Sequence, residues 1–193
     1  MSVMVVPERM RISADRYQKM FATGVLTEYD RIELIDGDII TMAPIGPPHS
    51  AVVARLIKLF VLSAGGSAIV SPGASVKLGE YSLPQPDLIL LKPRDDYYSG
   101  QLPTASDIVL AVEVSDSSLA FDQGTKRALY ARHGVAEYWV VDLPGQRVHV
   151  YSEPGVEGFA MARAHSLTDV VSPRELPAIQ ITVGTLFTLI STG

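Results

Sequence analysis

Cysteine is absent from the 193 residues, which excludes disulfides, thiolate zinc sites and cysteine nucleophiles. The chain also lacks an apolar N-terminal signal core, and no stretch reaches the roughly 18 apolar residues that a membrane-spanning helix needs. Neither the Gly-x-Ser-x-Gly motif of many serine hydrolases nor a nucleotide-binding phosphate loop occurs. These absences predict a cytoplasmic protein without membrane association, and they argue against serine-hydrolase, kinase and motor functions.

An excess of basic residues is lacking too, because 16 Lys and Arg stand against 21 Asp and Glu, giving a net charge of −5. Proteins that coat themselves in nucleic acid usually show a clearly basic balance. A nuclease stays compatible with this charge, since a site that gathers carboxylates around a cation adds negative charge of its own. With 47% apolar residues the chain can fill one core, and we expect a single domain over residues 1–193.

Two carboxylates stand at the ends of apolar runs. Asp87 opens the run 88–91, and Glu113 closes the run 108–112. A carboxylate at the end of a buried strand is held rigidly at the edge of a sheet, where two can converge on one hard cation. Magnesium is bound in this way, through one or two carboxylates together with phosphate oxygens of the substrate. The pattern therefore predicts a metal-dependent phosphodiesterase site.

The rest of the chain reads as alternating helices and strands, with no internal repeat or linker. Asp36-Gly37 between two β-rich runs within 31–42 is a strong hairpin signal. The segment 92–106 is polar and irregular, so we expect a surface excursion that could approach a substrate, and 115–120 reads as a loop. The predicted helices are 13–21, 51–62, 122–133 and a short one in 183–190, and the predicted strands are 67–71, 74–78, 88–91, 108–114, 137–141, 147–151 and 159–164. This order predicts a mixed α/β sheet flanked by helices, with an N-terminal helix and β-hairpin.

The predicted helix 122–133 carries Asp122, Lys126 and Tyr130 at four-residue steps, which places them on one face. One interpretation is that this face supports the carboxylate site. The alternative is a solvent-exposed Asp122–Lys126 pair, worth about 0.3–0.5 kcal/mol. Tyr138 and Trp139 lie in an apolar strand and are expected to pack in the core or an interface.

These residues together carry a family resemblance over roughly residues 10–190. The segments that carry it are Glu33-Leu-Ile-Asp-Gly, His49 at a helix start, Pro86-Asp87, Glu113-Val-Ser, Lys126, Tyr130 and Gly134-Val-Ala-Glu-Tyr-Trp139. They resemble the Uma-two family of endonucleases, which is similar to the PD-(D/E)XK nuclease superfamily. The resemblance implies a restriction-endonuclease-like fold and Mg²⁺-dependent hydrolysis of a phosphodiester, with Mn²⁺ as a possible substitute.

The resemblance also implies roles for individual residues. Asp87 and Glu113 would ligate the metal, with the backbone carbonyl of Val114 as a further ligand. The superfamily places a lysine two positions after the glutamate, where this chain has Ser115; in the Uma-two pattern the lysine lies on the following helix, which points to Lys126. Lys126 would orient the attacking water or help to deprotonate it.

Four residues have supporting roles in this scheme. Glu33 would hold a second metal or a water, or it would pair with Arg31 on the same strand face. His49 would contact phosphate or assist proton transfer, or it would simply start a helix. Asp122 and Tyr130 would position Lys126.

The sequence thus predicts a Mg²⁺-dependent endonuclease that acts on nucleic acid, most plausibly DNA, by direct attack of water. A homodimer would match the symmetry of a duplex. The alternative is a catalytically inactive nuclease fold that serves as a binding module. These two hypotheses differ first in whether Asp87, Glu113 and Lys126 converge.

Overall fold

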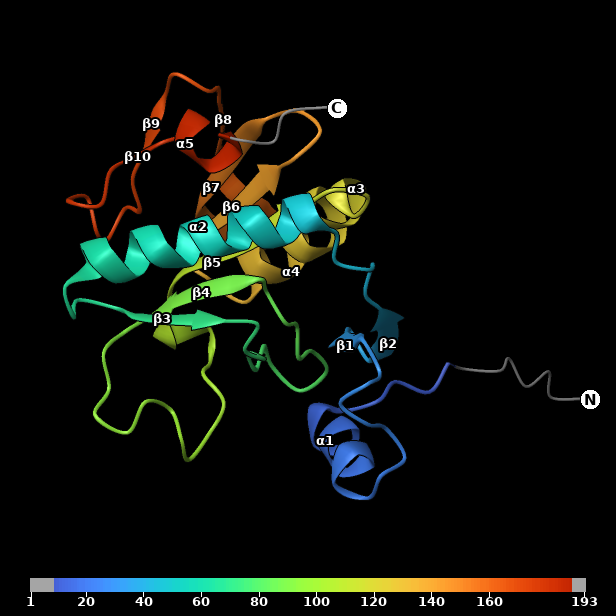
Figure 1. Cartoon of the computed structure of the whole chain (residues 1–193). Helices are drawn as coiled ribbons and strands as arrows, with labels where there is room; N and C mark the ends of the chain where they lie inside the picture. Colours follow the sequence, from blue (N-terminus) through green and yellow to red (C-terminus); the bar gives the residue numbers. More distant parts are fainter. Residues whose placement is uncertain (1–8, 189–193) are drawn as a thin grey trace, which may run out of the picture.

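A six-stranded mixed sheet forms the centre of the computed structural model, which describes residues 9–188 (Figure 1). The strand order is β3-β4-β5-β6-β7-β8; β5 and β6 run parallel, and the other neighbours run antiparallel. The strands are β3 (Ile69–Pro72), β4 (Leu88–Leu91), β5 (Ile108–Ser115), β6 (Glu137–Asp142), β7 (Arg147–Gly155) and β8 (Gly158–His165). The predicted mixed α/β architecture is confirmed.

Strands β4 and β5 lie in the interior of this sheet, and every residue of both is buried. Continuous apolar runs without alternation are typical of strands that are covered on both faces. The bounds of β4 are those predicted from the sequence. Strand β5 continues one residue further than predicted, to Ser115.

Helices cover both faces of the sheet (Figure 1). Helix α2 (Pro47–Ala64) packs Leu56 and Phe60 on one face, and α4 (Arg127–Arg132) packs Tyr130 on the other. Helix α2 begins four residues before the predicted start, because prolines are well suited to the first turn of a helix, where the missing N–H groups cost nothing.

The N-terminal part forms the predicted helix and hairpin. Helix α1 (Ala14–Ala22) packs on strands β1 (Ile32–Ile35) and β2 (Asp38–Thr41). Asp36 and Gly37 between the strands both have positive φ, 53° and 86°, as a two-residue type I′ turn requires. The hairpin is a separate two-stranded sheet, and one isolated bridge, Leu34 to Leu83, links it to the chain that leads into β4.

The crossover from β5 to β6 differs from the single predicted helix. It consists of α3 (Leu119–Phe121), a π-helical turn (Asp122–Lys126) and α4. The predicted loop over 115–120 is therefore wrong at both ends, since Ser115 belongs to β5 and Leu119 to α3. A π turn inserts an extra residue per turn and often occurs at functional sites.

The predicted strand over 74–78 is wrong. Val76 N–H donates to the carbonyl of Pro84 and Leu78 N–H to that of Ser82, so the backbone begins an antiparallel pairing. Pro84 has no N–H to return a hydrogen bond, and therefore no ladder forms. This segment makes only one isolated bridge, between Lys77 and Thr104.

The remaining elements are short, and those near the C-terminus pack beside α2 on one face of the sheet. They are a 3₁₀ turn (Ala105–Asp107), β9 (Val170–Val171), β10 (Ile181–Thr182) and α5 (Gly184–Phe187). The helix predicted in 183–190 is present as α5, while positions 189–190 lie outside the described residues. No helix within residues 9–188 is both long and apolar enough to cross a membrane.

Candidate active site

Asp87 and Glu113 lie side by side at one end of β4 and β5. The antiparallel register pairs Leu88 with Val112, so the next positions bring Asp87 opposite Glu113. Alternation along β5 points Glu113 to the face that α4 covers, whereas Asp87, just before β4, contacts His49 of α2. Both line one cavity of about 310 Å³, called here the acidic cavity. The sequence prediction that these two carboxylates meet at the edge of the sheet agrees with this arrangement.

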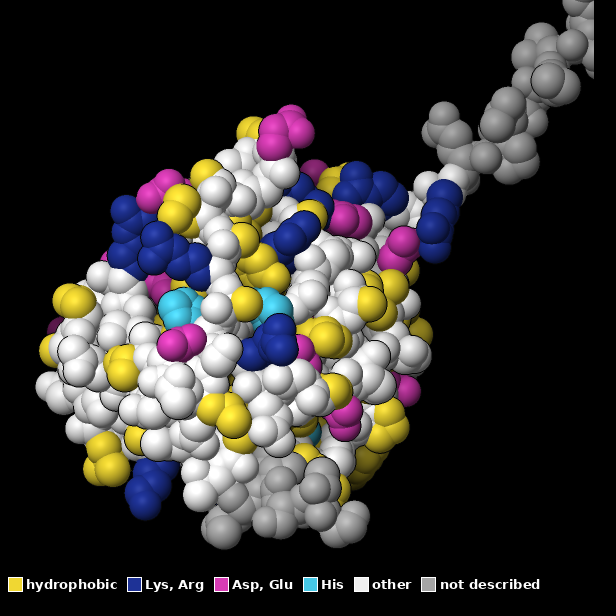
Figure 2. All heavy atoms as spheres, turned by 90° about the horizontal axis from the view of Figure 1, so that it is seen from above, with side chains coloured by type: hydrophobic (Ala, Val, Ile, Leu, Met, Phe, Trp, Pro, Cys, Tyr) yellow, Lys and Arg dark blue, Asp and Glu magenta, His cyan; other side chains and the backbone are white. Residues whose placement is uncertain are grey.

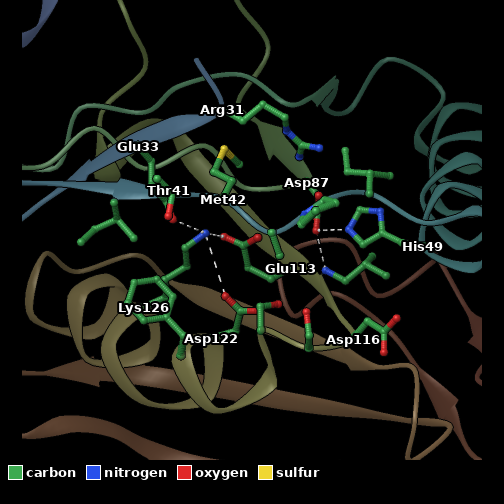
Figure 3. Close-up of a pocket in the computed structure, with 18 of the residues that line it drawn as sticks. Arg31, Glu33, Thr41, Met42, His49, Asp87, Glu113, Asp116, Asp122 and Lys126 are labelled. Carbon is green, nitrogen blue, oxygen red and sulfur yellow. Dashed lines mark hydrogen bonds and ion pairs between the residues drawn. The ribbon is translucent and has the colours of Figure 1, made fainter. Parts of the chain in front are cut away.

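Lys126 reaches the same place from the π-helical turn. Its Nζ lies 2.9 Å from Glu113 Oε1 and 3.0 Å from Glu33 Oε1, and its side chain is only 5% exposed (Figure 3). The lysine on the helix thus contacts the glutamate on the strand, as the family pattern implied. Glu33 pairs with Lys126, so the alternative pairing of Glu33 with Arg31 is wrong.

Asp122 and Tyr130 complete the buried cluster. Asp122 Oδ1 is 4.0 Å from Lys126 Nζ, and the Tyr130 hydroxyl donates to Glu113 Oε1 at 3.2 Å. All three side chains of this helical face are buried, which contradicts the alternative of an exposed Asp122–Lys126 pair. Tyr130 binds the same oxygen of Glu113 as Lys126 does, so any effect of Tyr130 on the position of Lys126 would pass through Glu113.

Ser115 has a structural role that the sequence did not reveal. Its hydroxyl donates to Asp122 Oδ2 at 2.7 Å, and the hydroxyl of Ser118 donates to the same oxygen at 2.6 Å. Ser115 therefore fixes the orientation of Asp122, a carboxylate 4.0 Å from Lys126 Nζ.

The acidic cavity has an excess of negative charge. Five carboxylates line it, against the cationic side chains of Lys126 and Arg31. Burial raises the pKa of Glu113 well above its usual range; Lys126 opposes this shift, and nearby carboxylates, Asp122 first, add to it. Burial alone would lower the pKa of Lys126, but the surrounding carboxylates, Glu113 foremost, outweigh it and raise that pKa. The raised pKa favours the charged ammonium form of Lys126. The carboxylates of the cavity still outnumber its cationic side chains.

His49 holds Asp87 from the first turn of α2. Its Nε2 lies 3.1 Å from Asp87 Oδ2, which also accepts a hydrogen bond of 2.7 Å from the backbone N–H of Val114. Nδ1 of His49 is buried and has no partner among the described residues. The hydrogen bond to Asp87 raises the pKa of His49 above 6.5, although burial opposes the shift. His49 lies in the first turn of α2, as one of the two alternatives predicted, and it also contacts Asp87.

The donor set suits a hard divalent cation. Within residues 9–188, no three Asp, Glu or His side chains are grouped closely enough to form a metal cage from protein ligands alone. Mg²⁺ does not require such a cage, since it commonly keeps waters and binds through one or two carboxylates plus phosphate oxygens. Over the same residues no hydrogen bond involves Oδ1 of Asp87 or Oε2 of Glu113, and the carboxylate excess favours a cation. The residues present therefore fit Mg²⁺.

Two charged residues of the cavity were missed by the sequence reasoning, Arg31 and Asp116. They lie two and three positions from the recognised residues Glu33 and Glu113, and that proximity in sequence was the only available signal. The excursion 92–106 follows Leu91, at the end of β4 that is far from Asp87, and it contributes no residue to the acidic cavity. Its predicted approach to the substrate is not supported.

Comparison with known proteins identifies the family of the chain. The model of the Uma2 family, described as putative restriction endonuclease, matches residues 15–184. The chain belongs to the Uma2 family. No curated protein matches the chain significantly.

A solved structure supports the fold of this Uma2 protein. The chain is similar to the crystal structure of a putative nuclease belonging to DUF820 from Anabaena variabilis ATCC 29413, with a TM-score of 0.72 and 19% sequence identity. The match covers 92% of this chain and 98% of the other. It confirms the fold, and the family description supports a nuclease, that is, a hydrolase acting on nucleic acid.

Proposed function

We propose that this Uma2 protein is a Mg²⁺-dependent endonuclease that hydrolyses phosphodiester bonds of DNA. The observation that carries the proposal is the convergence of Asp87, Glu113 and Lys126 on one wall of the acidic cavity. A pair of carboxylates for a cation and a fixed ammonium for phosphate charge are what this hydrolysis needs.

Asp87 and Glu113, with the backbone carbonyl of Val114, would hold the metal. When bound, Mg²⁺ supplies charge stabilisation to the phosphate and lowers the pKa of water. His49 and the N–H of Val114 fix the orientation of Asp87, which is a positioning role. Since Nε2 of His49 is engaged and Nδ1 is buried, we assign His49 neither phosphate binding nor proton transfer.

Lys126 would orient the attacking water and stabilise negative charge that develops on the phosphoryl oxygens. The carboxylates around it raise its pKa and so favour its charged form, which suits these roles better than deprotonation of water. Glu33 would keep Lys126 in place from the hairpin, at 3.0 Å.

Plasmid cleavage tests the proposal. Wild-type protein with Mg²⁺ or Mn²⁺ should nick supercoiled DNA, and a chelator should stop the reaction. Glu113→Gln should lose activity by at least about a hundredfold, as removal of a group that stabilises transition-state charge typically does. Glu137→Gln is the matched control, because Glu137 is also a buried strand glutamate but binds Trp139 and the N–H of Arg174, away from the acidic cavity.

The opposite result would favour the binding-module hypothesis. If wild-type, Glu113→Gln and Glu137→Gln are equally inert on duplex DNA, single-stranded DNA and RNA, the chain is not an active nuclease. Activity that survives unchanged in Glu113→Gln would assign the cleavage to another site or to a contaminant.

A further inference from the structure

A second cavity, of about 750 Å³, adjoins the acidic cavity. The two cavities are in contact, because they share five lining residues, Arg31, Met42, Ile45, His49 and Asp87. We call the second one the apolar cavity, because helix α2 gives it a hydrophobic wall, although two carboxylates, Glu28 and Asp30, also line it. Neither the family description nor the solved relative assigns a role to it.

The wall on α2 is formed by Val53, Ala54 and Ile57, at helical spacings that place them on one stripe. The neighbouring stripe, with Val52 and Leu56, packs in the core. Ala54 is exposed, while Val53 and Ile57 are only partly buried. Helix α2 thus has one apolar stripe in the core and a second one open to a cavity next to the acidic site.

Arg31 lies where the two cavities join. Its side chain extends from the start of the hairpin toward Asp87 and His49 (Figure 3). Among residues 9–188 it forms no ion pair, whereas the other cation of the acidic cavity, Lys126, is held by two carboxylates within 3.0 Å. Arg31 is therefore the cation that remains available for an incoming anion at this junction, and a guanidinium suits phosphate oxygens.

We propose that the apolar cavity binds the base of the nucleotide next to the scissile phosphate, and that Arg31 binds the phosphate between them. The inference rests on the proposed nuclease function and specifies its substrate. In a stacked duplex the faces of a base are covered by its neighbours, and only its polar edges are accessible in the grooves. An apolar wall matches a base face only when that base is unpaired. The substrate is therefore single-stranded DNA, or duplex DNA with a locally unpaired nucleotide.

The charge distribution agrees with this substrate. On the face shown in Figure 2, Lys and Arg side chains of the described residues are interspersed with Asp and Glu, and they form no continuous basic band across it. The whole chain carries a net charge of −5. A protein that gains little binding energy from the phosphate backbone needs other contacts. The faces of unpaired bases can provide them by packing against apolar side chains, without sequence preference.

Binding of a fluorescein-labelled oligothymidylate, followed by anisotropy with Mg²⁺, tests the proposal. Wild-type protein should bind this single strand more tightly than the same strand annealed to oligoadenylate. Val53→Gln should weaken single-strand binding about tenfold, as expected when a base loses its packing against one apolar side chain. Leu62→Gln is the matched control, since Leu62 is 73% exposed on the same helix and lines neither cavity. Ala54→Gln, at an exposed position that the fold tolerates, should act in the same direction.

Two further readouts separate the base from the phosphate. Arg31→Ala should reduce the slope of log K against log salt concentration by about 0.7, the value for one lost phosphate contact on a single strand. An abasic site moved along the oligothymidylate should weaken wild-type binding at one position, and the same lesion should have little further effect in Val53→Gln.

Equal binding of duplex and single strand, or equal affinities of Val53→Gln, Ala54→Gln and Leu62→Gln, would overturn the proposal. The cleavage assay on the same oligonucleotides keeps this result separate from failure of the proposed activity. Binding that depends on Val53 and Arg31 but is not followed by cleavage would support the base site and reject the nuclease function. Cleavage that is unchanged in the Val53 and Arg31 variants would support the nuclease function and reject the base site.

Discussion

Lys126 Nζ lies 2.9 Å from Glu113 Oε1, although the two residues are 13 positions apart and belong to a π-helical turn and a central strand. The ammonium group beside Glu113 thus comes from the crossover and not from β5, in which position 115 is a serine. The amine is supplied from the helix, and Ser115 fixes Asp122 beside it. The segment from β5 to the π-helical turn therefore contains Glu113, Lys126 and the serine that holds Asp122 beside them.

Loss of Lys126 should destabilise the fold. Lys126→Met leaves Glu33 and Glu113 buried without a cation, and breaking a buried pair in this way costs about 3–5 kcal/mol. Urea unfolding at pH 7 should show this loss, while Lys77→Met, which removes an exposed pair with Asp15, should cost at most about 1 kcal/mol. Without Lys126 the folded-state pKa of the carboxylates is raised, so the deficit should shrink as the pH falls and they become protonated. A deficit that stays constant down to pH 5 would contradict the charge explanation.

Binding of Mg²⁺ should stabilise the protein, because the cation neutralises part of the carboxylate excess. At ten times its dissociation constant, a ligand that binds only the folded state adds about 1.4 kcal/mol. Thermal unfolding with MgCl₂, against KCl at equal ionic strength, should therefore show a rise in Tm. Asp87→Asn should reduce the rise. An identical rise in Asp87→Asn would place the bound cation elsewhere.

His49 should make stability depend on pH in the absence of divalent cations. Its hydrogen bond to Asp87 raises its folded-state pKa above 6.5. The protonated His49–Asp87 pair therefore contributes stability that is fully present below about pH 6.5 and is lost as the pH rises through the raised pKa. The difference in unfolding free energy between wild type and His49→Gln should be largest near pH 5.5 and should decrease toward pH 8. A difference that grows with pH would be the wrong sign for this pair.

Gly124 should be replaceable with a gain in stability. It lies in the π-helical turn with negative φ, and an added Cβ would meet no atom within 4 Å. Gly124→Ala should stabilise the protein by about 0.4–1 kcal/mol, since alanine restricts the unfolded chain. Gly79→Ala should instead destabilise the protein, because Gly79 has φ +73° and an added Cβ would lie 2.8 Å from the ring of His133. Chemical denaturation of both variants checks the pair, and a loss of stability in Gly124→Ala would mean that the π turn itself depends on glycine.

The sequence predicted local features well where a short pattern determines the backbone. The Asp36-Gly37 hairpin and the fully apolar strand Leu88–Leu91 are examples, since turn geometry and burial on both faces leave few alternatives. The meeting of Asp87 and Glu113 followed from their places at strand ends. The false strand over 74–78 shows the limit, because its formation depended on whether the partner segment, with Pro84, could return hydrogen bonds.

Two features that depend on contacts between distant segments, the second apolar stripe of α2 and the position of Arg31, were not predicted. The second apolar stripe of α2, with Val53 and Ile57, reads as ordinary helix core, and only the tertiary arrangement leaves it facing a cavity. Arg31 likewise had a plausible neighbour, Glu33, on the same strand. The structure gives Glu33 to Lys126 and leaves Arg31 at the junction of two cavities, a result that needed the position of the crossover helix.

The hairpin β1–β2 is hydrogen-bonded as a sheet of its own, and the ion pair between Glu33 and Lys126 connects it to the crossover. Assembly of the acidic site and docking of the hairpin are therefore thermodynamically linked: whatever weakens the ion pair shifts the population toward molecules with an undocked hairpin. Arg31 moves with that hairpin, so the phosphate contact and the carboxylate cluster should be lost together. In such molecules the hairpin would no longer line the apolar cavity, and Glu33 would no longer lie beside Lys126.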